Sequence, residues 1–524
     1  MTRLERFSVL VAVVFLVLVF LTVSGFGRDF MNYIGLSLFA PPPPARLQIA
    51  CGINILNEPY LTNPTHNQVT LSLRLGKPGI MWAETSTDGV TWSGTPQQTI
   101  PRDQRADFIL SLSPNTAYQY RVACVNSDTG TPEYWFQNSF RSLPSPGAPT
   151  AFRFAYLTDT HYFQQYAKAY NGDASGIENV QQTVANILSW NPMFVIFGGD
   201  RMMPHCLNCQ NSSVDGESAG VNTAKTVRQA ELRNRQTIRE FQDLLARVPG
   251  VFYNGNHEGE NGFMQNIGVA KCGYRLDTDD VSEAARLKYL PSAALTYPGG
   301  DSTGNYYSFE VGLAQFTIID VMKYQSTLPS VPHAWNLGAA QGNWFGNILA
   351  SSNAPRKFVF AEHLVGGGAG GPPDCNGEYW YGRGQLKSKP SGTILGPFLG
   401  QQEELNQAMQ QAGGAIWFSG HDHEALFGTD FDIDGDPTGN YYILGGRGGD
   451  HSPSWASDPG VISQYDYNEN GIADYDETVD HASNKGGFWL VDVQQNGNTM
   501  FQYIATNTTN GDENNQPVIT KIIQ

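Results

Sequence analysis

The chain has 524 residues, which is too long for one ordinary hydrophobic core, so two or more domains are expected. Its formal net charge is −17, with 32 Lys and Arg against 49 Asp and Glu, and this balance argues against a polyanionic partner such as nucleic acid. Aromatic residues make up 12% of the chain, and this content together with the many apolar runs excludes a disordered protein.

A basic start precedes an almost unbroken apolar run from Phe7 to Val23. This pattern is typical of a secretory signal or a single membrane anchor, and we assign residues 1–25 to it. Val23-Ser24-Gly25 is a candidate cleavage site and the run is slightly short for a membrane span, so export is favoured and anchoring stays open. A Pro-rich linker follows at 26–45. We therefore expect an extracytoplasmic protein, secreted or anchored to the outer face of the membrane, with no other contact to a membrane.

The first domain is expected over residues 46–144 and has an all-β pattern. Runs such as Val69 to Leu75 alternate apolar and polar residues with period two, as half-buried strands do. The segment Leu112 to Tyr118 reads Leu-Ser-Pro-Asn-Thr-Ala-Tyr, which resembles a corner of fibronectin type III domains. In that corner the Tyr hydroxyl bonds back to the chain just before a core strand. A fibronectin type III-like β-sandwich is therefore predicted, with a mainly structural role.

Six cysteines fit an oxidising compartment. Cys51 and Cys124 both lie in the first domain, so a disulfide between them is expected. A zinc site at Cys206 and Cys209 competes with further disulfides, but no second Cys/His pair has matching spacing. The cysteines available for two further bridges are Cys206, Cys209, Cys272 and Cys375.

From residue 151 onward, apolar strand patterns alternate with helical patterns. Helical spacing covers 176–190 and 224–247, and an antiparallel strand pair is expected at 306–311 and 315–320. Such alternation implies a βαβ core with right-handed crossovers. The sequence therefore predicts an α/β domain over 150–524.

Five apolar runs of this second domain end in side chains that can bind metals. Each run has the pattern of a buried parallel strand, and ligands bind outside the carboxyl ends of such strands. The five ends are therefore expected to meet in one crevice. They are Asp159-Thr160-His161, Gly198-Gly199-Asp200, Gly255-Asn256-His257-Glu258, Glu362-His363 and Gly420-His421-Asp422-His423.

These fragments, in this order, resemble the calcineurin-like metallophosphoesterases over residues 152–506. The resemblance implies two βαβ sheets face to face, flanked by helices. It also implies two divalent or trivalent transition metals (Fe, Zn or Mn), with Asp200 as the bridging ligand and His257 facing the substrate to stabilise the transition state or protonate the leaving group. The other implied ligands are Asp159, His161 and His423 for the first metal, and Asn256, His363 and His421 for the second.

An all-β domain followed by such a catalytic domain resembles the purple acid phosphatases. Those enzymes bind one iron through a Tyr three residues after the bridging Asp, where this chain has Met203. This chain also has a histidine, His161, in its first fragment Asp159-Thr160-His161. The domain order is thus similar to that of a purple acid phosphatase, while the ligand set is similar to that of the broader family, so no tyrosinate colour is expected.

The resemblance implies an exported phosphatase that hydrolyses phosphate monoesters by attack of a metal-bridging hydroxide on a small phosphorylated substrate. One alternative is a phosphodiesterase acting on a nucleotide or a lipid headgroup. The other is a catalytically idle surface or adhesion protein with a calcium-stabilised phosphatase fold. An idle protein is expected to lose ligands, whereas every expected ligand position is filled here. Arg447 and His451, after a late strand, are candidates for substrate binding, with a turn-packing role equally open.

The segment from Asp466 to Glu477 fits the pattern Asp-x-Asn-x-Asn-Gly, then five residues and Glu, of a calcium-binding loop. Flanking helices are not evident, so the ion would be structural; the alternative is a solvated acidic loop. A looser match begins at Asp430, with Tyr441 where the last Glu is needed. The candidate calcium ligands are Asp466, Asn468, Asn470, Ile472, Asp474 and Glu477.

If this loop binds calcium, protein treated with EDTA and reloaded with Zn²⁺ or Mn²⁺ alone should unfold at a lower temperature than untreated protein. The cause is the loss of an ion that binds only the folded state. Thermal unfolding with and without added Ca²⁺ measures this. Full recovery of the midpoint without Ca²⁺ would refute the calcium site.

Overall fold

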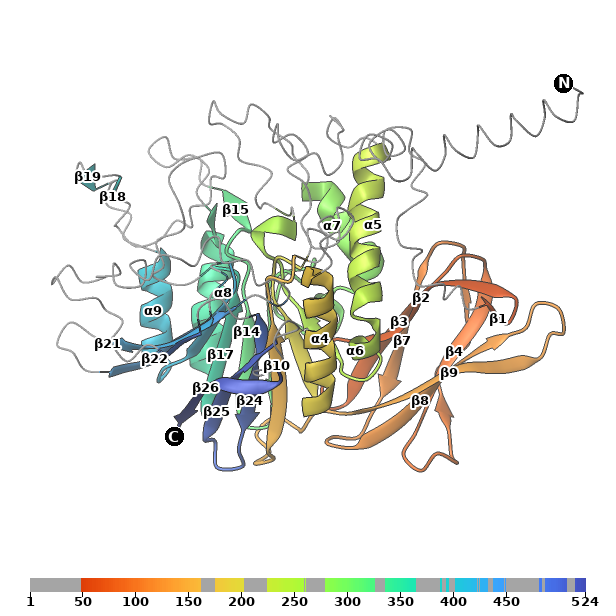
Figure 1. Cartoon of the computed structure of the whole chain (residues 1–524), viewed down its shortest axis with the longest axis horizontal. Coiled ribbons are helices and arrows are strands. Elements are labelled where there is room, and N and C mark those ends of the chain that lie inside the picture. Colours follow the sequence, from red (N-terminus) through yellow and green to blue (C-terminus); the bar gives the residue numbers. More distant parts are fainter. Residues whose placement is uncertain are drawn as a thin grey trace, which may run out of the picture. The chain divides into compact units, whose positions relative to one another are not determined.

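The computed structural model places the chain from residue 49 onward, and residues Ile49–Gln524 form one compact unit (Figure 1). The predicted signal or anchor and the Pro-rich linker lie outside the described residues. None of the described helices has the length and apolarity needed to span a bilayer. The described residues are 49–161, 175–201, 224–258, 260, 279–325, 335–363, 387–388, 393–394, 401–421, 423, 425–431, 437–446, 448, 480–482, 486–506 and 514–524.

The first part of this unit is an all-β sandwich of two antiparallel sheets, coloured red to orange in Figure 1. Apolar side chains from both sheets pack into one core, as the period-two alternation predicts. One sheet contains β2 (Ile53–Thr62), β3 (Gln68–Leu75) and β7 (Arg105–Ser111), with β1 (Ile49–Ala50) paired to β2. The other contains β4 (Gly79–Ser86), β5 (Ser93–Gly94), β6 (Gln98–Ile100), β8 (Ala117–Val125) and β9 (Pro132–Arg141).

Two local predictions for the sandwich are confirmed. Tyr118 Oη accepts a hydrogen bond from the backbone N–H of Ser113 at 2.8 Å, which is the backward bond expected from the Leu112–Tyr118 segment. Cys51 and Cys124 form a disulfide with their Cα atoms 6.2 Å apart. The other four cysteines lie outside the described residues.

The second part contains two mixed sheets that face each other. The first continues from the sandwich in the order β26-β25-β24-β10-β11-β12-β2-β3-β7, and the second has the order β13-β14-β17-β20-β22-β21-β23. The first adds β10 (Phe152–Leu157), β11 (Phe194–Phe197), β12 (Gly250–Phe252), β24 (Gly487–Val493), β25 (Thr499–Ala505) and β26 (Gln516–Ile523). The second comprises β13 (Tyr307–Val311), β14 (Ala314–Ile318), β17 (Arg356–Ala361), β20 (Ile416–Ser419), β21 (Ala425–Phe431), β22 (Pro437–Gly445) and β23 (Asp480–Ala482).

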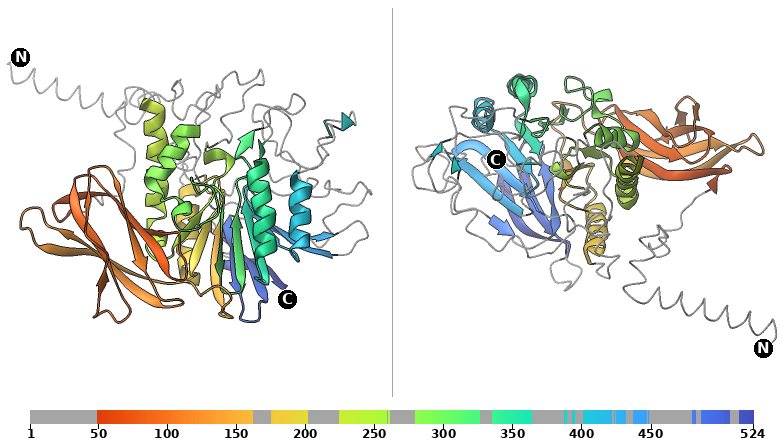
Figure 2. Two further views of the ribbon diagram at one scale, coloured as in Figure 1. Left: turned by 180° about the vertical axis from the view of Figure 1, so that it is seen from behind. Right: turned by 90° about the horizontal axis from the view of Figure 1, so that it is seen from above.

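Helices cover the outer face of each sheet, which gives a four-layer α/β/β/α arrangement (Figure 2). Strand β11 shows why its sequence is apolar throughout. Phe194 and Ile196 join the core between the sheets, while Val195 and Phe197 pack toward the helices, so both faces of the strand are buried. The predicted fold class, a two-sheet sandwich flanked by helices, is therefore confirmed.

The helices follow the predicted spacing with one change. The single helix expected over 224–247 is two helices, because the chain leaves helical geometry at Phe241. Phe241 is itself fully buried against the sheet. The helices are α4 (Ser175–Trp190), α5 (Ala224–Glu240), α6 (Gln242–Leu245), α7 (Asp279–Tyr289), α8 (Gly338–Ser351) and α9 (Gln401–Gln411).

The sandwich is tied to the second part by strand β2 and by hydrogen bonds of Tyr120 and Pro64. Strands β2 and β12 pair in parallel at Thr62 and Gly250. Tyr120 Oη donates a 2.7 Å hydrogen bond to the carbonyl of Ala246, and Tyr297 Oη donates one of 2.9 Å to the carbonyl of Pro64. These bonds between buried groups make the sandwich part of the frame that supports the second part.

Strand β14 is followed by a buried carboxylate, Asp320. Its backbone N–H and C=O are both bonded to the side chain of Gln341, and one carboxylate oxygen accepts from the N–H of Met322 at 3.0 Å. Burial, with Lys323 and the Met322 N–H acting against it, raises the pKa of Asp320 from 3.8 to about 7.

Because the pKa of Asp320 is higher in the folded chain than in the unfolded chain, the folded protein retains this proton from about pH 4 to pH 7. The contribution of Asp320 to the free energy of unfolding is fully present below about pH 4 and is lost as the pH rises through about 7. The total loss is up to about 4 kcal/mol. We expect Asp320→Asn to flatten this fall in the free energy of unfolding, measured by denaturant titration at several pH values. Asp128→Asn, at an exposed loop position, should leave the pH profile unchanged. Parallel profiles for wild type and Asp320→Asn would contradict the prediction.

Candidate metal centre

The five predicted strand ends meet at one edge of the two facing sheets. Strands β10, β11 and β12 run parallel in the first sheet, and β17 and β20 run parallel in the second. The carboxyl ends of parallel strands lie at the same sheet edge, which brings the segments after them together. The five segments therefore come from two sheets rather than from one.

The first group of candidate ligands comprises Asp159, His161, Asp200 and His423, whose ligand atoms lie within 4.8 Å of one another. The Nε2 atoms of His161 and His423 are 2.8 Å apart. Asp159 Oδ1 lies 3.2 Å from His423 Nε2, and Asp200 Oδ2 lies 3.9 Å from His161 Nε2. Two imidazoles and two carboxylates thus converge on one point, which is a ligand set suited to Zn, Fe or Mn.

The second group comprises Asp200, Glu362 and His421. The remaining two predicted ligands lie beside it: Asn256 Oδ1 is 3.1 Å from His421 Nδ1, and the ring centroid of His363 is 4.3 Å from that of His421. Asp200 belongs to both groups, which is the position that a carboxylate bridging two metals must occupy. The structure thus brings together all seven predicted ligands.

The backbone of these segments is held in an uncommon conformation. A positive φ places a non-glycine residue in the left-handed region, which is sparsely populated and clusters at functional sites. Five of the seven predicted ligands have φ between 41° and 66°. They are Asp159, His161, Asp200, His421 and His423.

Bonds between the segments hold them in this arrangement. The N–H of His421 donates to both oxygens of Asp159 at 3.0 and 3.1 Å, which joins the two sheets. The N–H of His161 donates to the carbonyl of Asp200 at 2.9 Å, and the N–H of Gly420 donates to the carbonyl of Glu362 at 3.0 Å.

One end of the site faces solvent. The exposed fraction of the His423 side chain is 21%, whereas the side chain of Asp159 is fully buried, so the exposed end is the one after β20.

Two glutamates that the sequence analysis did not assign a role lie in the same site, and both are buried. Glu258 accepts hydrogen bonds from the backbone N–H groups of Asp200, Arg201 and Gly255 at 2.9, 3.0 and 2.6 Å. Burial raises the pKa of Glu258, and Arg201 acts against this rise. Burial, followed by the neighbouring Asp200, raises the pKa of Glu362 well above its usual range.

Four buried carboxylates therefore lie in the site, and Arg201 offsets one of their charges. Burying negative charge in this way is costly unless cations compensate it. This buried Asp and His cluster could hold metal ions. Two features of the sequence could have indicated that these glutamates belong to the site. Glu362 directly follows the apolar run of β17, and Glu258 is the last residue of Gly-Asn-His-Glu.

The structure does not place every predicted residue. His257 belongs to the short 3₁₀ helix Asn256–Glu258, but its side chain is outside the described part. Arg447, His451 and the calcium loop from Asp466 to Glu477 also lie outside the described residues, as do residues 432–436 of the looser loop that begins at Asp430. Their roles stay predictions.

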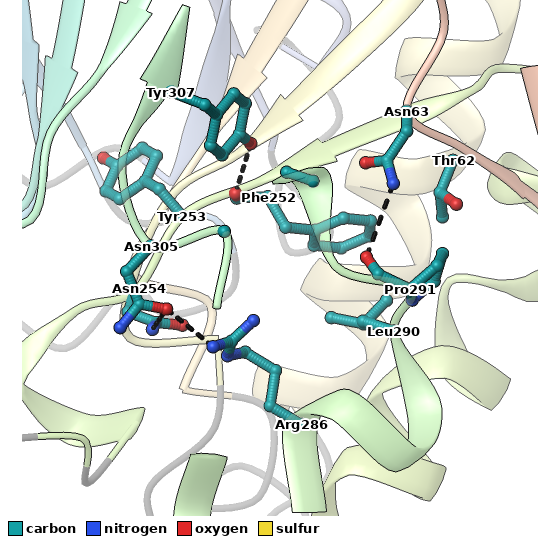
Figure 3. A pocket seen from close by; sticks show the side chains of 12 residues that line it. Thr62, Asn63, Phe252, Tyr253, Asn254, Arg286, Leu290, Pro291, Asn305 and Tyr307 are labelled. Carbon is teal, nitrogen blue, oxygen red and sulfur yellow. Dashed lines mark hydrogen bonds between the residues drawn. The ribbon is translucent and has the colours of Figure 1, made fainter. Parts of the chain in front are cut away.

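A small pocket lies behind the segment that leads to Asn256 (Figure 3). Its volume is about 20 Å³, which is room for a water molecule and far too little for a phosphate ester. Arg286 contacts Glu260 at 2.6 Å and donates to Asn305 Oδ1 at 2.6 Å, and Asn254 also donates to that oxygen at 3.4 Å. This network supports the Asn254–Asn256 segment from the side of α7.

No protein-family model and no curated protein sequence matches the chain. Solved structures do match it. The structure of PhoD superposes with a TM-score of 0.60 at 14% identity, covering 89% of this chain and 88% of that chain. Purple acid phosphatase PPD1 from yellow lupin (Lupinus luteus) seeds superposes with a TM-score of 0.58 at 16% identity, covering 88% of this chain and 73% of that chain. At these identities the likeness concerns the fold. This chain therefore shares the fold of PhoD and of purple acid phosphatase PPD1 over most of its length.

Proposed function

We propose that this protein is an exported, metal-dependent phosphatase that hydrolyses small phosphate monoesters. The observation that carries the proposal is the pair of ligand groups that share the buried Asp200. The fold shared with a purple acid phosphatase supports the same reaction class. The resemblance of the ligand sequence motifs to those of the calcineurin-like metallophosphoesterases agrees with both observations.

Each residue has a definable task in this proposal. Asp200 would contribute to both cation sites, because its carboxylate belongs to both ligand groups. Asp159, His161 and His423 would hold one cation, and the other would be held by Asn256, His363 and His421. Two such ions would supply Lewis acidity and a nucleophile derived from water.

The negative charge of the site requires that cations bind before the substrate does. The buried carboxylates would repel a phosphate ester dianion until cations are present. The partly exposed His421 and His423 form the solvent side from which substrate would arrive. His257, whose backbone directly follows Asn256 in the 3₁₀ helix, is proposed to face the substrate and protonate the leaving oxygen.

We also propose an extracytoplasmic location. The disulfide between Cys51 and Cys124 fits an oxidising compartment. The apolar run over residues 7–23 fits an export signal or an anchor.

The test is metal content and turnover of the purified chain and of Asp200→Asn. Asn tolerates the left-handed conformation that Asp200 adopts at φ 53°, so the backbone should be retained. We expect two transition metals per wild-type chain, and a loss of more than about 100-fold in metal affinity and in turnover of a chromogenic phosphate monoester for the variant. Metal content is measured by elemental analysis, and turnover is compared with that of the matching diester.

Asp128→Asn, at an exposed position of the sandwich, is the charge-matched control and should behave as wild type. His257→Ala should lower turnover while keeping both metals. A chain that binds no transition metal would refute the proposal and favour an idle surface protein. Faster turnover of the diester would replace the monoesterase with a diesterase.

A further inference from the structure

Two buried glutamates at the metal centre have opposite surroundings. Glu258 receives three backbone N–H groups, and its Oε1 lies 3.8 Å from Arg201 Nη2. Glu362 is 0% exposed, and neither of its carboxylate oxygens receives a hydrogen bond from the part of the chain that the structure describes. The described residues thus satisfy the hydrogen bonding of Glu258 but not that of Glu362.

A buried carboxylate without a hydrogen bond costs free energy, so the fold is expected to exclude it unless it has a task. Instead, the neighbouring segments leave room for it. A Cβ atom added to Gly199 would collide with Glu362 Oε2, and one added to Gly255 would lie 2.8 Å from Glu362 Cδ. Both glycines belong to the segments after β11 and β12, so three strand ends shape the space around this carboxylate.

The carboxylate lies where a cation could reach it. One of its oxygens is within 4.8 Å of ligand atoms of Asp200 and His421. Cation–oxygen distances of about 2.0–2.6 Å allow two ligand atoms on one ion to lie up to about 5 Å apart. Glu362 therefore satisfies the geometric requirement for a ligand on the His421 side of Asp200.

We propose that Glu362 is a further ligand of the second cation, the one that Asp200, His421, Asn256 and His363 would hold. The inference rests on the proposed metal-dependent function and adds a residue to it. With Glu362 this site has two carboxylates and an amide oxygen beside its imidazoles. Such oxygen-rich surroundings lessen the usual preference of a site for Zn²⁺ over Mn²⁺, because carboxylate and carbonyl ligands suit the harder ion.

The test compares wild type with Glu362→Gln and Glu258→Gln, using Mn²⁺ and Zn²⁺ alone as probes. Glu362→Gln keeps the shape of the side chain and removes its charge. We expect it to weaken Mn²⁺ binding at one site at least about tenfold, and Zn²⁺ binding less. In metal-free protein the same change should raise the unfolding midpoint, because a buried carboxyl group whose oxygens receive no hydrogen bond from the described residues costs more free energy than a neutral amide. Titration calorimetry and thermal unfolding of the metal-free chain provide these readouts without any activity assay.

Glu258→Gln is the matched control at the second buried glutamate. It replaces an acceptor of three N–H groups by an amide, so the metal-free midpoint should fall. Opposite shifts of the midpoint in the two variants, with Mn²⁺ binding weakened in Glu362→Gln, support the proposal.

Other outcomes would overturn it. If wild type binds two Mn²⁺ ions and Glu362→Gln binds them within twofold of the same affinity, Glu362 is no ligand, while the proposed function survives. A lower metal-free midpoint for Glu362→Gln would show that the protein itself satisfies this carboxylate, and would also refute the proposal. Wild-type protein that binds neither Mn²⁺ nor Zn²⁺ would refute both this inference and the proposed function.

Discussion

The structure depends on negative charge that is buried between two sheets. Asp159, Asp200, Glu258 and Glu362 lie at one edge of the core, each at most 2% exposed, and Arg201 offsets one of these charges. Removing carboxylates from water costs several kcal/mol each, even after relaxation of the protein. Such a cluster is retained in a stable fold when cations or hydrogen bonds compensate it. Backbone N–H groups do this for Glu258 and, from His421, for Asp159. Metal ions are the remaining candidates for Glu362, whose oxygens receive no hydrogen bond from the described residues.

The aromatic core between the sheets makes this arrangement rigid. Phe154 contacts Phe194 of its own sheet and Phe316 and Phe358 of the facing sheet, with ring centroids 5.2 to 5.4 Å apart. A close-packed interior resists small displacements, so the strand ends that emerge from it keep their spacing. Left-handed residues in those ends each cost about 1–3 kcal/mol. They persist because bonds such as the one from His421 to Asp159 hold both sheets to one geometry.

The sandwich supports the site from a distance. Two of its arginines contact α7: the guanidinium of Arg74 lies 4.5 Å from the ring centroid of Tyr289, and Arg105 donates to the carbonyl of Leu287. One turn earlier on the same helix, Arg286 binds Glu260, which closely follows Asn256 in the chain. The sandwich, α7 and a predicted ligand segment thus form one connected series of contacts. The structural role expected for the sandwich has a physical basis in this series.

The sequence by itself determined the elements and the chemistry of the site. Apolar runs that end in Asp, Asn or His predict buried strands with polar carboxyl ends, because local patterning reports burial on both faces. The backward bond of Tyr118 and the Cys51–Cys124 pair were also predictable, since each depends on a short segment or on few alternatives. Only the tertiary structure decided which strand joins which sheet, because β10 and β20 look alike in sequence and their neighbours are set by long-range packing. The break at Phe241 and the unbonded carboxylate of Glu362 depend on the same packing. A glutamate after an apolar strand gives no sign of its partners until the segments that surround it, which are distant in the chain, have come together.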